Sequence, residues 1–324
     1  MRAPQFKKWF ARLPALNVRQ RLHTLAALHP AAGLDQVTAL IAQVGAAIRR
    51  CPSCACQRYH RHGQAGGLQR YRCRQCRRTY NDLSGTPLAR LRLREKWLDY
   101  LGCLLELTSV RAAASQLGVH RNTAFRWRHR FLERPKHDLP QRLHGIAEAD
   151  EMFILESQKG ARQLNRPPRK RGGRASRRGI SRDLDCILVA RDRSGQTIDA
   201  VVGRGALTAA QLERHLLPRL DRQVLLVSDS HGAYRSFARK HRIAHEAVNL
   251  RAGMRVRHGA AGAIHVQNVN SYHQRFRQWL SRFRGVASRY LPNYLGWRRA
   301  LDGGRVGSAE QLLRIAIGVI NIDR

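Results

Sequence analysis

The sequence is poor in acidic residues, in long apolar runs and in cysteine. Only 22 of its 324 residues are Asp or Glu, and none lies between Glu246 and Asp302. No stretch approaches the roughly 18 consecutive apolar residues of a membrane span, so we expect none. The first residues, MRAPQFKKWFARLPAL, lack the apolar core of a secretory signal, which predicts a cytoplasmic chain. Seven cysteines are too few for a disulfide scaffold, and in a reducing compartment closely spaced pairs indicate a metal site.

Basic residues are abundant instead. Lys and Arg number 60, which gives a formal net charge of +38 at pH 7. An apolar fraction of 43% is sufficient for packed cores, which excludes a disordered basic tail. A folded protein this basic has a polyanion as its first partner hypothesis, either a nucleic acid or an anionic membrane surface.

Changes in composition divide the chain into five parts, since a chain this long exceeds one ordinary domain. In order, we expect an N-terminal helical segment, a cysteine-containing segment, a helical DNA-binding domain, a linker and an α/β domain, at residues 1–48, 49–85, 86–135, 136–145 and 146–324. In the first part, helical apolar spacing on both sides of Gly33 predicts two or three short amphipathic helices.

The last part has the alternation of an α/β sheet domain. Short apolar runs typical of strands occupy residues 148–155, 186–190, 197–202 and 224–228. Helical stretches at 207–220 and 231–242 alternate with the later runs, which indicates a sheet covered by helices. Between the first two runs, residues 161–182 are rich in Lys and Arg and predict a basic loop that can contact phosphates.

Two cysteine pairs indicate a zinc ribbon. Cys51 and Cys54 form one CxxC motif and Cys73 and Cys76 form a second, with eighteen residues between them. A two-residue gap lets both thiolates of a pair bind one ion, and four thiolates complete the tetrahedral shell of a structural Zn²⁺. An iron–sulfur site and four unrelated thiols are the alternatives. Nearby residues that can also bind metal are Cys56, His60 and His62.

The surface of this ribbon is expected to contact DNA. Arginines alternate with tyrosines, as in basic aromatic nucleic-acid surfaces; a plain solvated face is the alternative. The residues concerned are Arg58, Arg61, Arg70, Arg72, Arg74, Arg77 and Arg78, with Tyr59, Tyr71 and Tyr80.

Residues 109–131 predict a helix-turn-helix. An Ala-rich helix ends before Gly118, and a short basic helix follows at 121–131. The second helix would enter the major groove, unless the segment is an ordinary three-helix bundle with a charged face. Side chains expected to face bases or phosphates are His120, Arg121, Asn122, Thr123, Arg126, Arg128 and Arg130.

Because acids are scarce, their positions are informative. Asp150 lies within the first strand-like run, and Asp229 directly follows the run 224–228 and precedes a helix. Two aspartates on one sheet can share Mg²⁺ or Mn²⁺, and such ions activate a nucleophile and stabilise the leaving oxygen in phosphodiester chemistry. Acids at strand ends are also common without any such role.

Four segments in this order resemble bacterial insertion-sequence transposases of the ISXO-like type. They are CPSC…RYRCRQCRRTYNDLSGTPL, the helix-turn-helix, the Asp150-Glu151 pair, and VSDSHGAY followed by HVQNVNSYHQRFRQWLSRFRGVA. The resemblance spans about residues 46–300. It implies a multidomain α/β protein whose last domain has a ribonuclease-H-like fold.

The resemblance also implies a third metal-binding residue on a helix after the last strand, Glu in most such enzymes and Asn in some. The motif places Asn270 there, with Asn268 as the alternative after a two-residue shift, and Arg277 where the family often has Lys. Arg277 would hold a phosphate. Glu148 and Glu151 are candidate supplementary ligands, and the nearby histidines are His231, His265 and His273.

The implied function is that of a DNA transposase with structural Zn²⁺ and catalytic Mg²⁺ or Mn²⁺. It would bind the terminal inverted repeats and the target DNA as a homodimer or larger assembly, with no membrane partner, near the nucleoid. Asp150, Asp229 and Asn270 would be catalytic. The alternatives are a catalytically inactive zinc-ribbon DNA-binding regulator, a structure-specific nuclease of similar fold, and an RNA-binding protein.

Overall fold

The computed structural model describes the chain except residues 1–2, 171, 249–255, 260–261 and 319–324. The chain forms two compact units, Met1–Phe131 with Ser308–Arg324, and Leu132–Gly307, and each is described by itself. The helix α10 (Ala309–Ile317) belongs to the first unit, whereas composition had grouped all of residues 146–324. An amphipathic pattern shows that a helix is buried on one side, but it does not say which helices cover it.

The N-terminal segment contains one short helix and one long helix, where two or three short helices were expected. After α1 (Ala3–Phe10), α2 (Val18–Ile48) continues through Gly33 for 31 residues. The expectation was wrong because Gly33 does not end a helix; it allows a close contact between two segments. A Cβ atom at Gly33 would lie 2.7 Å from the carbonyl oxygen of Glu95, so glycine lets α2 approach the 3-10 turn η2 (Arg94–Lys96).

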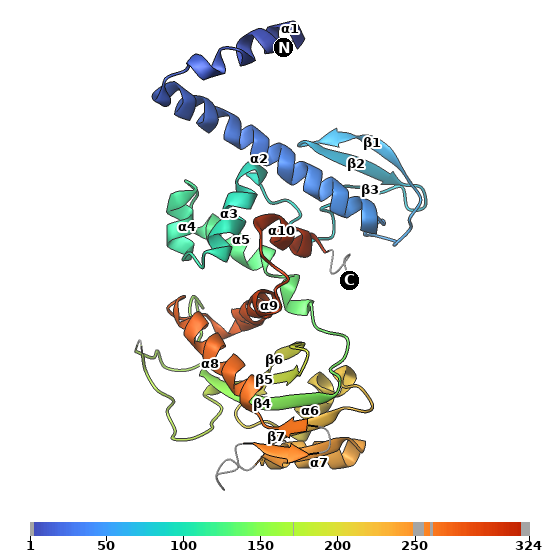
Figure 1. The fold of residues 1–324 in the computed structure, drawn as a ribbon, viewed down its shortest axis with the longest axis vertical. Helices are drawn as coiled ribbons and strands as arrows, with labels where there is room; N and C mark the ends of the chain where they lie inside the picture. The colour runs from blue at the N-terminus through green and yellow to red at the C-terminus, as the bar shows by residue number, and fades with distance from the viewer. Residues whose placement is uncertain (1–2, 171, 249–255, 260–261, 319–324) are drawn as a thin grey trace. The chain divides into compact units, whose positions relative to one another are not determined.

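A small antiparallel sheet follows α2 (Figure 1). Its strands are β1 (Tyr59–Ala65), β2 (Leu68–Cys73) and β3 (Thr79–Tyr80), in that order. The first cysteine pair precedes β1, and the second runs from Cys73 at the end of β2 to Cys76 in the turn before β3, as in the zinc ribbon that the spacing predicted.

Three helices then form the expected helix-turn-helix region. They are α3 (Trp97–Leu105), α4 (Val110–Gln116) and α5 (Arg121–Phe131). The Ser109 side chain accepts a hydrogen bond from the Ala112 backbone N–H and begins α4. Four buried aromatic side chains from α3 and α5 form the core: Trp97, Tyr100, Trp127 and Phe131.

The second unit is built on one mixed five-stranded sheet (Figure 1). Its strands are β4 (Ile146–Leu155), β5 (Leu184–Asp192), β6 (Thr197–Arg204), β7 (Leu225–Asp229) and β8 (Ala244–Val248). Their order is β6-β5-β4-β7-β8. The strand β5 pairs antiparallel with β4 on one side and with β6 on the other. The strands β7 and β8 run parallel to β4. The four expected strands are confirmed, and β8, AHEAV, was missed because its alternation is weak.

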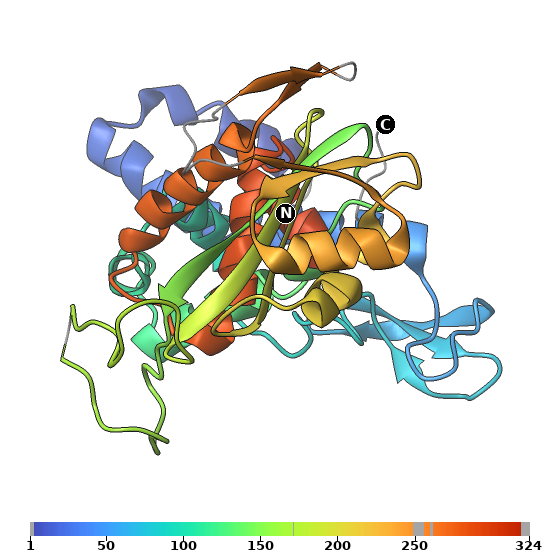
Figure 2. The same cartoon turned by 90° about the horizontal axis from the view of Figure 1, so that it is seen from below.

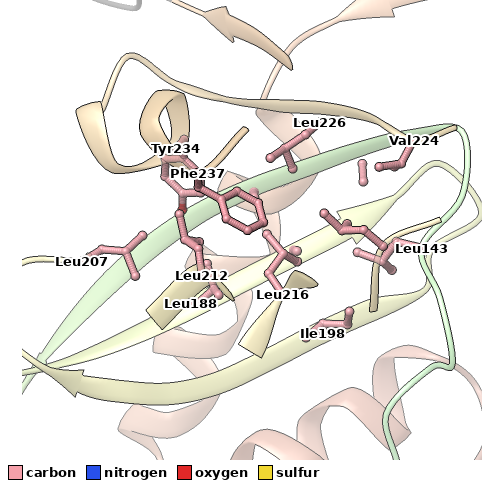
Figure 3. Packing of buried hydrophobic residues seen from close by; sticks show 14 of the residues in the cluster. Leu143, Leu188, Ile198, Leu207, Leu212, Leu216, Val224, Leu226, Tyr234 and Phe237 are labelled. Carbon is pink, nitrogen blue, oxygen red and sulfur yellow. The ribbon is translucent and has the colours of Figure 1, made fainter. Parts of the chain in front are cut away.

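Helices cover both faces of this sheet (Figure 2). On one face lie α6 (Ala209–His215) and α7 (Gly232–His241), and on the other α8 (Gln267–Ser281) and α9 (Leu291–Asp302). Figure 3 shows Leu212 and Leu216 with Tyr234 and Phe237 packed on the sheet near Leu188. The burial of these apolar side chains fixes α6 and α7 on the sheet.

Two further connections lie near β4. The hairpin of β9 (Arg257–Gly259) and β10 (Gly262–Ile264) precedes α8, and the basic loop joins β4 to β5. That loop extends away from the sheet (Figure 2). None of the helices in the described ranges has the length and apolarity needed to cross a membrane.

Candidate active site and metal centre

The sulfur atoms of Cys51, Cys54, Cys73 and Cys76 all lie within 4.8 Å of one another. Cys51 and Cys76 Sγ atoms are 3.5 Å apart, and Cys54 and Cys73 Sγ atoms 3.6 Å. Four thiolates about 2.3 Å from one zinc ion are about 3.8 Å apart, so the arrangement fits Zn²⁺. Within the described residues, no second group of three or more Cys, His, Asp or Glu side chains gathers this closely.

The two cysteine pairs have matching backbone turns. The residue after each pair, Ala55 or Arg77, adopts a positive φ, of 58° and 61° respectively. The Ala55 N–H donates to the Cys51 carbonyl at 2.8 Å, and the Arg77 N–H donates to the Cys73 carbonyl at 3.2 Å. Each turn therefore directs both thiols of its pair toward the same point.

Backbone donors also favour the thiolate that a metal requires. The Cys76 N–H points at the Cys73 sulfur and, against the opposing effect of burial, lowers the pKa of Cys73 to about 6. Cys73 is thus largely a thiolate at neutral pH, the form that a metal ion would bind.

The alternative ligands lie outside this cluster. The Cys56 sulfur accepts from the Arg58 N–H at 3.3 Å, and His60 and His62 are exposed on β1. The structure therefore groups the four cysteines of the two CxxC motifs alone.

The expected aromatic DNA surface of the ribbon is wrong for two of its three tyrosines. Tyr71 and Tyr80 are buried against the cysteines and form the ribbon core. Tyr59 is half-buried and accepts from Arg49. Arginines remain exposed on this surface, namely Arg58, Arg61, Arg74, Arg77 and Arg78.

The outer face of α5 presents polar and basic side chains. Arg121, Asn122 and Arg126 are exposed, and Thr123 is half-buried. The expectation that Arg128 also reaches DNA is wrong, because Arg128 is 1% exposed and its guanidinium donates to the Thr108 carbonyl at 2.6 Å.

Arg130 has an intramolecular contact as well. It is exposed, but its guanidinium donates to the Pro87 carbonyl at 3.0 Å. The predicted DNA-contacting side chains of α5 that remain available are therefore Arg121, Asn122, Thr123 and Arg126.

In the second unit, the sheet brings Asp150 and Asp229 together. The parallel strands β4 and β7 pair Ala149 with Ser228, and the next residue on each strand is one of the two aspartates. The β7 pairing with β4 ends at this point, so both carboxylates lie where the sheet opens beside β4.

Asp150 lies in a pocket of about 390 Å³ between β4 and α8. The other lining residues are Glu151, Asn270, His273, Gln274 and Arg277. Those from α8 are Asn270 and the residues three, four and seven positions after it, which is the spacing of one helix face. The His273 Nδ1 atom is 3.7 Å from Asp150 Oδ2. Asp229 does not line this pocket, but its charge acts on Asp150.

Negative charge is concentrated at this site. Burial, and then the neighbouring charges of Glu151 and Asp229, raise the pKa of Asp150 to about 7, although Arg277 opposes them. Burial and Asp229 also raise the pKa of Glu151, whose Oε2 accepts from the Tyr234 hydroxyl at 3.1 Å. A divalent cation bound to these carboxylates would remove the repulsion between them.

His273 adds a neutral nitrogen beside these acids. Burial, with a smaller effect of Arg277, lowers the pKa of His273 to about 4. The imidazole is therefore uncharged at neutral pH.

The geometry separates the two candidate asparagines. Asn268 donates its side-chain N–H to Glu148 Oε1 at 2.9 Å, whereas Asn270 is exposed and lines the pocket with Asp150. Glu148 is completely buried and lies outside the pocket lining. Of the two candidate supplementary acids, only Glu151 adjoins the pocket.

Three residues around this site escaped the sequence analysis. Gln274 lines the pocket, Tyr234 contacts Glu151, and Arg193 pairs with Glu148. Gln274 was predictable from the helix period, because it lies one turn after Asn270. Tyr234 and Arg193 lie on other elements, and nothing in their local sequence indicates the contact.

Comparisons with known proteins agree with the resemblance. Residues 142–298 match the ISXO2-like transposase domain family, and residues 90–136 match the homeodomain-like domain family. A Halobacterium salinarum protein, described as an uncharacterized protein in transposable element ISH50, is 30% identical over 248 residues. That match covers 76% of this chain and 82% of the relative.

Solved structures give more distant matches. A pre-cleavage Mos1 transpososome is 18% identical with a TM-score of 0.20. The match covers 63% of this chain and 78% of the Mos1 chain. The Mos1 strand transfer complex is 19% identical with a TM-score of 0.19, and covers 63% and 77%. At this distance they carry no argument about the site. The match to the transposase domain and the 30% identical relative assign the chain: it belongs to the ISXO2-like transposase family.

Proposed function

We propose that this protein is a DNA transposase that binds the terminal inverted repeats of an insertion sequence and catalyses metal-dependent strand cleavage and strand transfer. The observation that carries the proposal is the meeting of Asp150 and Asp229 on adjacent parallel strands, beside a pocket that α8 lines with Asn270 and Arg277. Residues far apart in sequence supply acids, a neutral oxygen ligand and a cation to one place.

The chain's own groups fit Mg²⁺ or Mn²⁺. The carboxylates of Asp150 and Asp229 and the amide oxygen of Asn270 would hold the ion. When bound, such an ion lowers the pKa of water and stabilises a leaving oxygen. Asn270 binds through its carbonyl oxygen but supplies neither charge nor a base. Arg277 is exposed at the pocket and would hold a non-bridging phosphate oxygen.

The reaction has two balanced steps. In the first, a water oxygen bonds to phosphorus at the element end, the bond from phosphorus to the 3′ oxygen breaks, and that oxygen retains the electron pair and gains a proton. In the second, the 3′-hydroxyl loses its proton and attacks a target phosphodiester, whose own 3′ oxygen leaves. Each step exchanges one ester bond, so no outside energy source is required.

The first unit would recognise the element end. On the outer face of α5, Arg121, Asn122, Thr123 and Arg126 would contact a major groove. The exposed arginines of the ribbon would contact phosphates. Two ends must be joined to one target, so the active form would be a homodimer or a larger assembly.

The test is Mg²⁺-dependent joining of a labelled element end, taken from the inverted repeats flanking the gene, to a plasmid. We expect the wild type to join it, and Asp150→Asn and Asp229→Asn to lose cleavage by at least about 1,000-fold while binding the end normally. Equal cleavage by wild type and both variants would remove the catalytic assignment.

The same assay separates a second candidate, a DNA-binding regulator without catalysis. The uncharged Asn270 at the third ligand position favours it, because an asparagine weakens a metal site. Specific end binding without cleavage at any Mg²⁺ or Mn²⁺ concentration would establish the regulator. Cutting of branched DNA without strand joining would indicate a nuclease instead.

A further inference from the structure

Glu148 is a fully buried carboxylate two residues before Asp150 on β4. Because side chains alternate along a strand, Glu148 and Asp150 point to the same face, the one covered by α8. Glu148 Oε1 accepts from the Asn268 side chain at 2.9 Å, and Oε2 accepts from the Val269 backbone N–H at 3.1 Å. One carboxylate therefore holds two successive residues in the first turn of α8.

Among the described residues, the helix α8 has only one local side-chain cap, His265 Nδ1, which accepts from the Gln267 N–H at 3.3 Å. Its N-cap residue is Val266, whose side chain has no hydrogen-bonding group. The first backbone N–H groups of a helix have no partner inside the helix and attract negative charge. Glu148 provides that charge from the neighbouring strand, as a capping residue would from within the chain.

Arg193 and His265 complete the cluster around Glu148. Arg193 from the β5–β6 turn pairs with Glu148, and His265 Nδ1 lies 3.1 Å from Glu148 Oε1. Arg193 also donates to the Ala263 carbonyl of β10 at 2.8 Å. Glu148 thus connects β4, the β5–β6 turn, β10 and the start of α8, and its charge is compensated.

We propose that Glu148 is a positioning residue that fixes α8 on β4 and thereby sets Asn270 against Asp150 for metal binding; this rests on the proposed function. Asn270 lies one residue after Val269, so a shift of the first turn moves its amide oxygen directly. A neutral ligand contributes little attraction, so its contribution depends on being held in place before the ion binds.

The test measures Mn²⁺ affinity of the full-length protein, with Mn²⁺ alone as the probe, by isothermal titration. We expect Glu148→Ala to weaken Mn²⁺ binding by about 10- to 100-fold. Glu148→Gln keeps the length and one acceptor oxygen, so it should recover part of the affinity. Asn268→Ala, a milder change that removes one hydrogen bond, should weaken binding less.

The matched control is Asp185→Asn on β5. Asp185 is also a buried carboxylate, but it accepts from Ser288 and pairs with Arg204, away from α8. We expect this variant to lose thermal stability while its Mn²⁺ affinity stays within twofold of the wild type. Hydrogen exchange at the α8 N-terminus should accelerate in Glu148→Ala and Asn268→Ala, and not in Asp185→Asn.

The outcomes distinguish this inference from the function it rests on. No Mn²⁺ binding by the wild type, or unchanged binding in Asp150→Asn, contradicts the proposed active site and the inference with it. Binding that Asp150→Asn abolishes, but that Glu148→Ala and Asn268→Ala leave unchanged, overturns the positioning role alone.

Discussion

At the scale of single residues, Asp150 carries the clearest physical signature of a site. Its carboxylate is half-buried, and desolvation, followed by the charges of Glu151 and Asp229, raises its pKa from 3.8 to about 7. The native protein therefore binds more protons than the unfolded chain between these two values. A carboxylate whose ionised form is destabilised by its surroundings is a candidate functional group, because a bound cation would stabilise that form.

This pKa predicts how stability depends on pH. Because the folded-state pKa is raised, the metal-free protein should lose stability as pH rises from about 4 to about 7, by an amount on the order of 4 kcal/mol. Asp150→Asn should remove that loss and be more stable than the wild type at pH 8. Urea unfolding in a chelator, at pH 5 and pH 8, measures both. If the stability difference between the wild type and Asp150→Asn is the same at pH 5 and at pH 8, the charge on Asp150 does not destabilise the fold.

Gly33 is a second residue whose role is local and physical. A Cβ atom there would meet the backbone oxygen of Glu95, which cannot move aside as a side chain can. We expect Gly33→Ala to destabilise the protein by about 1–3 kcal/mol despite alanine's better helix propensity. Gly102→Ala in α3 is the control, since no atom lies within 4 Å of its added methyl, and it should be neutral or stabilising. Thermal unfolding of both variants decides.

At the scale of elements, we expect the ribbon to depend on a bound metal ion, because its core is small. Cys51, Cys73, Tyr71 and Tyr80 are its buried members, and little other apolar surface is available to them. Thiolates without an ion between them repel one another, so the binding free energy of the ion is also the folding free energy of the segment.

The choice among cysteines is testable in the same element. Cys54→Ser removes one of the four clustered sulfur atoms and should lose bound zinc and specific DNA binding. Cys56→Ser, five residues after Cys51 and outside the cluster, should keep one zinc per chain. Zinc content is read by a chromophoric chelator after thiol modification. Retention of zinc by Cys54→Ser together with its loss from Cys56→Ser would show that the ligand set is different.

The helix-turn-helix shows what an element's sequence leaves open. The pattern correctly gave two helices and a turn at Gly118, because small residues and a glycine are readable locally. It did not separate exposed Arg126 from buried Arg128, because both belong to one basic stretch. Only the packing of α5 on its neighbours decides which arginine faces water.

At the scale of the whole molecule, a net charge of +38 must be distributed so that the units still fold. The basic loop between β4 and β5 shows how. Buried Glu156 pairs with Arg166 and Arg169 and holds the inner part of the loop. Other cations of the loop remain exposed, among them Lys170, Arg174, Arg177 and Arg178.

This division predicts a difference between outer and inner cations. Replacing Lys170, Arg174 and Arg177 with Gln should leave stability unchanged. It should also reduce the slope of log affinity for DNA against log salt concentration, by about 0.9 for each phosphate that these cations neutralise in the wild type. Arg166→Gln with Arg169→Gln should lower stability instead, because buried Glu156 loses two of its three ion-pair partners and keeps only Arg204. DNA affinity between 50 and 200 mM salt, with thermal unfolding, tests both. An unchanged slope would exclude the loop from the DNA interface.

The sequence by itself determined the features that depend on neighbours along the chain. These are the two CxxC pairs, the helix-turn-helix, four strands and two helices after residue 146, and the scarcity of acids that drew attention to Asp150 and Asp229. Their spacing follows from the periods of helices and strands and from the reach of two thiolates to one ion, so no knowledge of distant contacts was required.

Only the tertiary structure decided what depends on which elements meet. The register of β4 with β7 puts the two aspartates side by side, and the seating of α8 gives Asn268 to Glu148 and Asn270 to the pocket. The assignment of α10 to the first unit was equally invisible. Burial depends on packing between segments far apart in sequence, and a local pattern shows only that a face is buried, not against what.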